Sequence, residues 1–180
     1  MELVAKNRKQ STEEAGRNIR RACFHETAEK VNANKIALAH HKNDGAETLL
    51  LNLARGTGLK GLGGIRPVQG AYIRPLLCVS RAEIEAYLQD QNLTYCNDVT
   101  NESDDYTRNR IRNHIIPYLE EEVNPAAVQH MGETMEQLQQ IQDFMEESVA
   151  AAFPEVVDAK ENFCLIKNNE FAKLHSALKP

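Results

Sequence analysis

Acidic side chains and an arginine recur on one short stretch of this chain. Wound at 3.6 residues per turn, the stretch after residues 36–39 puts four polar side chains on one stripe: Asp44, Glu47, Thr48 and Arg55. Carboxylates beside an arginine and a Gly-x-Gly turn suit a Mg-nucleotide better than a lone acid–base role. From the pattern alone, a solvated helix face explains the same stripe equally well.

A strand followed by a helix would position these side chains. Residues 36–39 read as a short buried strand, His40 and His41 follow it, and a helix is expected over residues 43–54. Open α/β sheets bind their ligands where a strand ends in polar residues at a helix start. The opposite stripe of the helix is apolar and is expected to pack against the sheet: Ala46, Leu49, Leu50 and Leu53. Residues 56–64 contain five glycines, which predict a loop with one helical turn that a ligand can approach closely.

The remaining elements are mostly helical, so the fold class is a helix-rich α/β protein. A capping box at Ser11 predicts a helix over residues 11–31, and a second box at Ser80 predicts a helix to about residue 89. Strands are expected over residues 72–74 and 163–166. A helix over residues 106–116 is expected to end or kink before Pro117, and a last short helix starts near residue 169.

The longest predicted helix starts near residue 124 and runs to residue 152. Its apolar residues recur at three- and four-residue steps, which indicates one packing seam along its whole length: Val128, Met131, Met135, Leu138, Ile141, Met145, Val149 and Ala152. The methionines are interpreted as core filler rather than as ligands.

Three arginines close together could bind phosphate groups. Arg108 and Arg112 are one helical turn apart, and Arg110 lies between them. A phosphate-binding patch and an intramolecular tie are almost equally favoured by the pattern. The acids considered for such a tie are Asp98, Asp104 and Asp105.

Charge is distributed unevenly along the 180 residues. The net charge is −5, yet no lysine or arginine lies between Arg112 and Lys160. Any contact with a polyanion must therefore come from the first part, and a domain boundary is expected near residues 117–124. No apolar run is long enough for a membrane span, and four scattered cysteines without an export signal indicate a cytoplasmic protein with reduced thiols.

Several motifs in a fixed order resemble tRNA(Ile)-lysidine synthetase, an N-type ATP pyrophosphatase family. They are A-H-H-K-N-D-G-A-E-T at 39–48, R-G-T-G-L at 55–59, R-P-L-L at 74–77, S-R-x-E-I at 80–84, N-D-x-T-N at 97–101 and Y-T-R-N-R-I-R at 106–112, with S-T-E-E-A-G-R at 11–17 upstream. The resemblance covers about residues 11–119 and weakens beyond them.

The resemblance implies a fold and an activity. Residues 1–118 would be the C-terminal part of a Rossmann-like catalytic domain of the adenine nucleotide alpha hydrolase type, and residues 119–180 an all-helical domain that recognises tRNA. Such an enzyme adenylates C2 of the wobble cytidine of tRNA(Ile) bearing a CAU anticodon, using ATP and Mg²⁺. Lysine then displaces AMP to form lysidine. The expected partners are tRNA(Ile), lysine and ATP.

The resemblance also assigns roles to individual residues. Catalytic roles fall to Asp44, which is also the expected metal ligand, and to His41 and Arg55. Nucleotide contacts are expected from His40, Glu47, Thr48, Arg55, Gly56 and Gly58. Substrate contacts are expected from Arg74, Arg108, Arg110 and Arg112. Each has a structural alternative; Arg74, for example, could instead anchor the edge of the sheet.

Two departures from the family pattern stand out. The S-G-G-x-D-S phosphate loop does not occur in these 180 residues, so the chain reads as a fragment that is inactive alone. Asn43 stands where the family pattern has the first of two aspartates, which puts metal affinity in doubt. The alternatives are a tRNA thiolase of the same group, disfavoured because no C-x-x-C pair occurs, and a non-catalytic module that binds tRNA or a protein partner. Either a homodimer or an altered packing of the first helices is expected, because an incomplete sheet exposes an edge.

Overall fold

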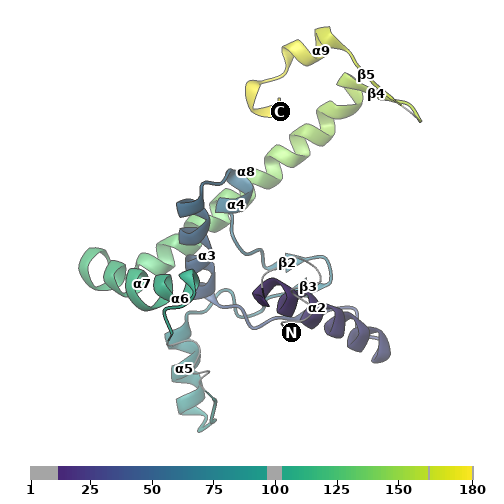
Figure 1. Ribbon diagram of the computed structural model, residues 1–180. Helices are drawn as coiled ribbons and strands as arrows, with labels where there is room; N and C mark the ends of the chain where they lie inside the picture. The colour runs from purple at the N-terminus through teal and green to yellow at the C-terminus, as the bar shows by residue number, and fades with distance from the viewer. Residues whose placement is uncertain (1–11, 97–102, 162, 180) are drawn as a thin grey trace. The chain divides into compact units, whose positions relative to one another are not determined.

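The computed structural model describes residues 12–96, 103–161 and 163–179 of the chain. The chain divides into two compact units, one comprising residues 1–41 and 66–79 and the other residues 42–65 and 80–180. Figure 1 shows the chain and labels most of its helices and strands. No helix in the described ranges is both long enough and apolar enough to cross a membrane.

The first unit combines one helix with a small sheet. The helix α2 spans Thr12–Lys30, and the strands are β1 (Ile36–Ala37), β2 (Val68–Gln69) and β3 (Tyr72–Ile73). Among the described residues, β3 lies between a parallel β1 and an antiparallel β2, with Ile36 opposite Tyr72 and Val68 opposite Ile73. The expected helix and the strands at 36–39 and 72–74 are confirmed, whereas β2 was not expected. The expected burial of the first strand is wrong, because Ile36 is half-buried and Ala37 is exposed. The capping box at Ser11 lies outside the described residues.

The second unit is mainly helical and contains α3 and α8. Its elements in chain order are α3 (Lys42–Arg55), α4 (Leu59–Leu62), α5 (Arg81–Asp90), α6 (Thr107–Arg110), the π-helical turn η2 (Ile111–Ile115), α7 (Ile116–Tyr118), the π-helical turn η3 (Leu119–Val123), α8 (Ala127–Val156), β4 (Val157–Ala159), β5 (Cys164–Ile166), α9 (Asn168–Lys173) and the 3₁₀ turn η4 (Ser176–Leu178). The helices predicted at 43–54 and 124–152 and the helical turn within residues 56–64 are confirmed. The capping box of α5 is present, because Ser80 Oγ accepts from Glu83 N at 3.2 Å and Glu83 Oε2 accepts from Ser80 N at 2.7 Å.

The core of this unit lies where α3 crosses α8 (Figure 1). Ala46 of α3, Ile111, Ile116 and Val128 form the buried cluster, and Leu50, Leu51 and Met131 pack against it. Within this unit the apolar stripe of α3 packs on residues 111–128 and on α8, and its last member, Leu53, is exposed. The packing of α3 on the sheet stays a prediction.

Two expectations for the second half of the chain need correction. The helix does not end before Pro117, because the chain continues through this residue in α7, between two π-helical turns. The alternative, a kink before Pro117, is not contradicted, since π-helical turns and prolines are both common causes of kinks. The part after residue 119 is not all-helical, because β4 and β5 pair antiparallel, with Val157 opposite Ile166. The β-branched and aromatic residues near both strands favour this pairing over helix.

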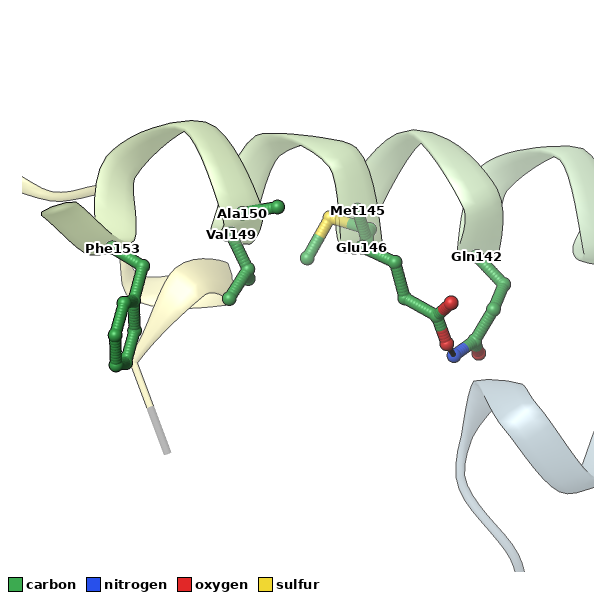
Figure 2. A pocket seen from close by; sticks show the side chains of 6 residues that line it. All are labelled: Gln142, Met145, Glu146, Val149, Ala150 and Phe153. Carbon is green, nitrogen blue, oxygen red and sulfur yellow. Dashed lines mark hydrogen bonds between the residues drawn. The ribbon is translucent and has the colours of Figure 1, made fainter.

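The apolar seam of α8 is interrupted in its second half. Val128 and Met135 are buried, whereas Ile141 and Val149 are exposed. Met145 and Ala152 are half-buried between and beyond them, and Figure 2 shows a shallow hollow there whose lining side chains all come from α8. A continuous seam along the whole helix is therefore wrong at Ile141 and Val149.

Met135 fills a gap bordered by two glycines. A Cβ placed on Gly45 would lie 2.8 Å from Met135 Cε, and one on Gly64 would lie 2.7 Å from Met135 Sδ. Gly64 also has a φ of +62°, which L side chains rarely adopt. The methionine acts as core filler here, as predicted, and it needs both glycines beside it.

Substituting Gly64 should destabilise the second unit through both effects. We expect Gly64→Ala to lower the free energy of unfolding by about 2–4 kcal/mol, because it combines left-handed strain with a clash against Met135. The matched control is Gly56→Ala, whose φ is +75° but whose Cβ would meet nothing within 4 Å. Urea denaturation measures both. Equal losses in the two variants would show that strain alone, and not the packing of Met135, requires glycine at position 64.

Candidate functional site

A fully buried carboxylate lies at the centre of the second unit. Glu47, in α3, is 0 % exposed, and it is the largest side chain that is fully buried among the described residues. Its Oε2 lies 2.7 Å from Nε of Arg108, and its Oε1 lies 2.6 Å from Nε of Arg112. Arg112 Nη2 also donates to Oε2 at 3.0 Å. Both carboxylate oxygens are therefore engaged by guanidinium groups.

Asp44 completes this group one helical turn earlier in α3. Its Oδ1 lies 3.4 Å from Nη2 of Arg108 and 3.4 Å from Nη2 of Arg112. Arg108 Nη2 also donates to the Asp44 backbone carbonyl at 3.2 Å. We call these four residues, Asp44, Glu47, Arg108 and Arg112, the acid–arginine cluster. Its two negative and two positive charges balance.

Spacing within the two helical segments makes the cluster possible. Asp44 and Glu47 are three residues apart on α3, and Arg108 and Arg112 are four apart on α6 and η2, so each pair shares a helix face. Burial of four charged groups is tolerated because each is paired and hydrogen-bonded. The hydrogen bonds that Arg112 donates to Glu47 raise the pKa of Arg112, and the charges of Glu47 and Asp44 act in the same direction against the effect of burial.

Solvent reaches the members of the cluster unequally. The side chain of Asp44 is 14 % exposed, whereas that of Glu47 is 1 % exposed. Of the two acids, Asp44 is therefore the one that solvent reaches, and Glu47 is enclosed. The charged stripe predicted for α3 exists, but its alternative, a solvated face, is wrong at Glu47 because partners distant in sequence cover it.

The other residues predicted on or after α3 lie outside the cluster. Thr48 Oγ1 donates to the Asp44 carbonyl at 2.8 Å, a bond that matches its structural alternative. Arg55, Gly56 and Gly58 are exposed at the far end of α3. The end of the glycine loop is held in place: Asn52 Nδ2 donates to Gly61 O at 2.8 Å, and Gln139 Nε2 donates to Gly63 O at 2.6 Å.

Arg110 differs from its two neighbours. It is exposed, and its Nη2 lies 3.5 Å from Thr107 Oγ1. Among the acids considered as intramolecular partners of the arginines, Asp104 is bound by His114, whose Nε2 lies 2.6 Å from Asp104 Oδ2. Asp98 lies outside the described residues. The hydrogen bond from His114 lowers the pKa of Asp104. The intramolecular tie exists for Arg108 and Arg112, and among the described residues their acid partners are Glu47 and Asp44.

Three predicted site residues belong to the first unit. Because β1 and β3 are parallel, His40 and His41, which follow β1, and Arg74, which follows β3, lie at the same edge of the sheet. Arg74 is 8 % exposed, and its Nη1 donates to the Arg66 carbonyl at 2.6 Å. This bond matches the alternative in which Arg74 anchors the sheet edge.

The surroundings of Asp44 do not fit a Mg²⁺ ligand. Two guanidinium groups lie 3.4 Å from its Oδ1 and occupy the oxygen that Mg²⁺ would need, and a divalent ion would bring twice the charge of an ammonium group to this site. No group of three or more metal-binding side chains occurs in the part of the chain that the structure describes. Asn43, where the family pattern has an aspartate, accepts from Arg81 N at 2.9 Å and so caps α5. The sequence did not reveal this contact.

Comparisons with known proteins agree with the resemblance. The family model described as "PP-loop domain" matches residues 1–119. The chain belongs to the PP-loop family. The chain is also 43 % identical over 176 residues to a protein named tRNA(Ile)-lysidine synthase from Caldanaerobacter subterraneus subsp. tengcongensis, covering 98 % of this chain and 38 % of that protein.

Two further relatives of this PP-loop chain carry the same name. The one from Parabacteroides distasonis is 49 % identical over 71 % of this chain and 29 % of its own length. The one from Clostridioides difficile is 40 % identical over 94 % of this chain and 37 % of its own length. The chain thus spans less than two fifths of the curated relatives it matches.

Proposed function

We propose that this PP-loop chain is part of an enzyme that ligates lysine to C2 of the wobble cytidine of tRNA(Ile) bearing a CAU anticodon, with ATP as the energy source. The observation that carries the proposal is the acid–arginine cluster, a buried and charge-balanced group with one carboxylate accessible at its rim. The names of the relatives and the PP-loop match support the substrate assignment.

The chemistry would proceed in two steps. The C2 oxygen of cytidine attacks the α-phosphorus of ATP, which releases pyrophosphate and leaves an adenylate. The ε-amine of lysine then attacks C2, and AMP leaves with the C2 oxygen. Lysine must be neutral to attack, so a base has to accept a proton from its ammonium group.

Asp44 is the residue proposed to accept that proton. Its side chain is more exposed than that of Glu47, so the amine can reach it. Glu47 would position the cluster by fixing Arg108 and Arg112. Both arginines would contact substrate anions at the rim, because their side chains remain 32 % and 23 % exposed. Mg²⁺ would accompany the ATP phosphates, and no step is assigned to it at Asp44.

The finer assignments of fold and partners are part of the same proposal. The parallel pair β1 and β3 would belong to a Rossmann-like sheet of the catalytic domain, with its boundary near residue 118. Residues 119–180 would contribute to tRNA recognition, and two copies would assemble. His40, His41, Thr48, Arg55, Gly56 and Gly58 would contact the nucleotide, and Arg110 the RNA backbone, since an exposed guanidinium binds phosphate well.

The experiment is transfer of labelled lysine to a CAU tRNA(Ile) with ATP. The protein should be tested in a form that carries an S-G-G-x-D-S loop, beside the 180-residue chain and a tRNA with a different anticodon. We expect transfer by the first form on the CAU tRNA only, and none by the 180 residues alone. Binding of tRNA without lysine transfer by the loop-containing form would instead support the non-catalytic module.

A further inference from the structure

The first unit contains a buried arginine without a carboxylate partner. Arg74 is 8 % exposed, and its hydrogen bonds go to neutral acceptors: the Arg66 carbonyl at 2.6 Å and Gln69 Oε1 at 3.4 Å. Its Nε is buried and has no hydrogen-bond partner among the described residues. A buried charge is normally paired with an opposite charge, because removing an ion from water is costly. Arg74 departs from that rule.

Two more arginines increase the positive charge near Arg74. Arg17 and Arg21 are four residues apart on α2 and share a face. Burial lowers the pKa of Arg74, and the charges of Arg21 and Arg17 lower it further, so the three guanidinium groups repel one another. Among the described residues, none of the three forms a salt bridge with an acid.

Aromatic contacts hold α2 against β3 at this place. The guanidinium carbon of Arg21 lies 5.5 Å from the centroid of the Tyr72 ring. One turn further along α2, His25 packs edge-on against Tyr72, and its Nε2 lies 2.9 Å from the Tyr72 hydroxyl. Tyr72 lies two residues before Arg74, so these contacts hold the face of α2 that carries the arginines beside β3, which Arg74 directly follows.

We propose that Arg17, Arg21 and Arg74 form a binding site for a phosphate group. Three uncompensated guanidinium groups suit an anion that carries more charge than one carboxylate and presents several acceptor oxygens. Arg17 and Arg21 are exposed and would contact the phosphate oxygens, while Arg74 contributes charge from the buried side. The phosphate is either that of a free polyphosphate or that of an RNA backbone. The RNA case rests on the proposed function, and the free polyphosphate case does not.

The test compares a double variant with a matched control on the same helix. Arg17→Gln/Arg21→Gln removes the exposed pair. Arg20→Gln removes one arginine of α2 that is equally exposed but does not act on Arg74. With inorganic pyrophosphate as the probe, calorimetry of the full 180-residue chain should show affinity at least about tenfold weaker in the double variant than in wild type. Arg20→Gln should bind like wild type.

The RNA source is read from the salt dependence of tRNA binding. The slope of log K against log salt should flatten by about 1.4–1.8 units in the double variant if both arginines contact phosphates. Weaker pyrophosphate binding with an unchanged slope assigns the site to a free polyphosphate. A flatter slope with unchanged pyrophosphate binding assigns it to the RNA backbone. If wild-type chain binds no tRNA, the RNA part of the proposed function fails while the pyrophosphate measurement still decides the site.

A charge-preserving variant separates binding from folding. Arg17→Lys/Arg21→Lys keeps the positive charge but loses the planar fork, so it should keep the salt slope and weaken pyrophosphate binding. If the glutamine variant does not fold, the lysine variant decides the question by its pyrophosphate affinity. Wild-type values in the lysine variant, or equal values in Arg17→Gln/Arg21→Gln and Arg20→Gln, would overturn the proposal.

Discussion

Glu47→Ala is expected to lower the free energy of unfolding of the second unit by about 3–5 kcal/mol. The substitution removes a carboxylate that is 1 % exposed and leaves Arg108 and Arg112 facing each other with Asp44 as their remaining acid in the cluster. Urea denaturation followed by far-UV circular dichroism measures the loss. Glu47→Gln keeps the shape of the side chain and isolates the contribution of its charge.

The control is an ion pair of similar length on the surface. Arg81 Nε and Glu85 Oε1 lie 2.7 Å apart, and both side chains are more than one third exposed. Glu85→Ala should therefore cost no more than about 1 kcal/mol, because exposed pairs gain little over solvation. If Glu47→Ala cost no more than Glu85→Ala, the acid–arginine cluster would not hold α3 to α6 and η2.

Asp44→Asn should reduce lysine transfer by about 10²-fold or more while leaving tRNA affinity unchanged. An amide keeps the size of the carboxylate but cannot take a proton from the lysine ammonium, and general bases contribute about this much. The measurement is single-turnover lysine transfer by the form that carries the phosphate loop. ATP–pyrophosphate exchange in the same variant should persist, since the proposed role belongs to the second step.

Asp90→Asn supplies the matched control for this substitution. Asp90 is the last residue of α5, is exposed, and lies outside the cluster. It should transfer lysine at the wild-type rate. Asp44→Asn protein that is folded and transfers lysine as fast as Asp90→Asn would exclude Asp44 as the base. If Asp44→Asn lost ATP–pyrophosphate exchange as well as lysine transfer, Asp44 would act in the adenylation step instead.

The sequence predicted the helices and strands better than it predicted which residues pack against them. The capping box at Ser80, the apolar strand before His40 and the helical turn among the glycines depend on neighbouring residues, and the structure confirms them. The burial of Glu47 depends on arginines 61 and 65 residues away. Periodicity within α3 shows which residues share a face but cannot show what covers that face.

The same limit explains the misassigned surfaces. Leu53 and Ile141 fit the apolar stripes of α3 and α8, yet both are exposed because nothing among the described residues packs over them. The site residues illustrate the limit differently: motif order picked out Arg108 and Arg112 together with Glu47, and only the structure shows that they bind one another. Apart from its place in a motif, nothing in the sequence singled out Arg17 as a site residue. Its proximity to Arg74 depends on the packing of α2 against β3.

The hydrogen bonds from Gln139 to the glycine loop restrain α8 at one point along its length. Its amide donates to Gly63 O and to Ile65 O, and Met135 fills the gap one turn before, so rotation and sliding of the helix are both restrained at this point. Beyond it, α8 continues to Val156. At 1.5 Å per residue this arm is about 26 Å long. A tilt of about 10° at the restraint would move its tip by roughly 4–5 Å. A tilt of α8 at the glycine loop would therefore be amplified along the helix toward Val156.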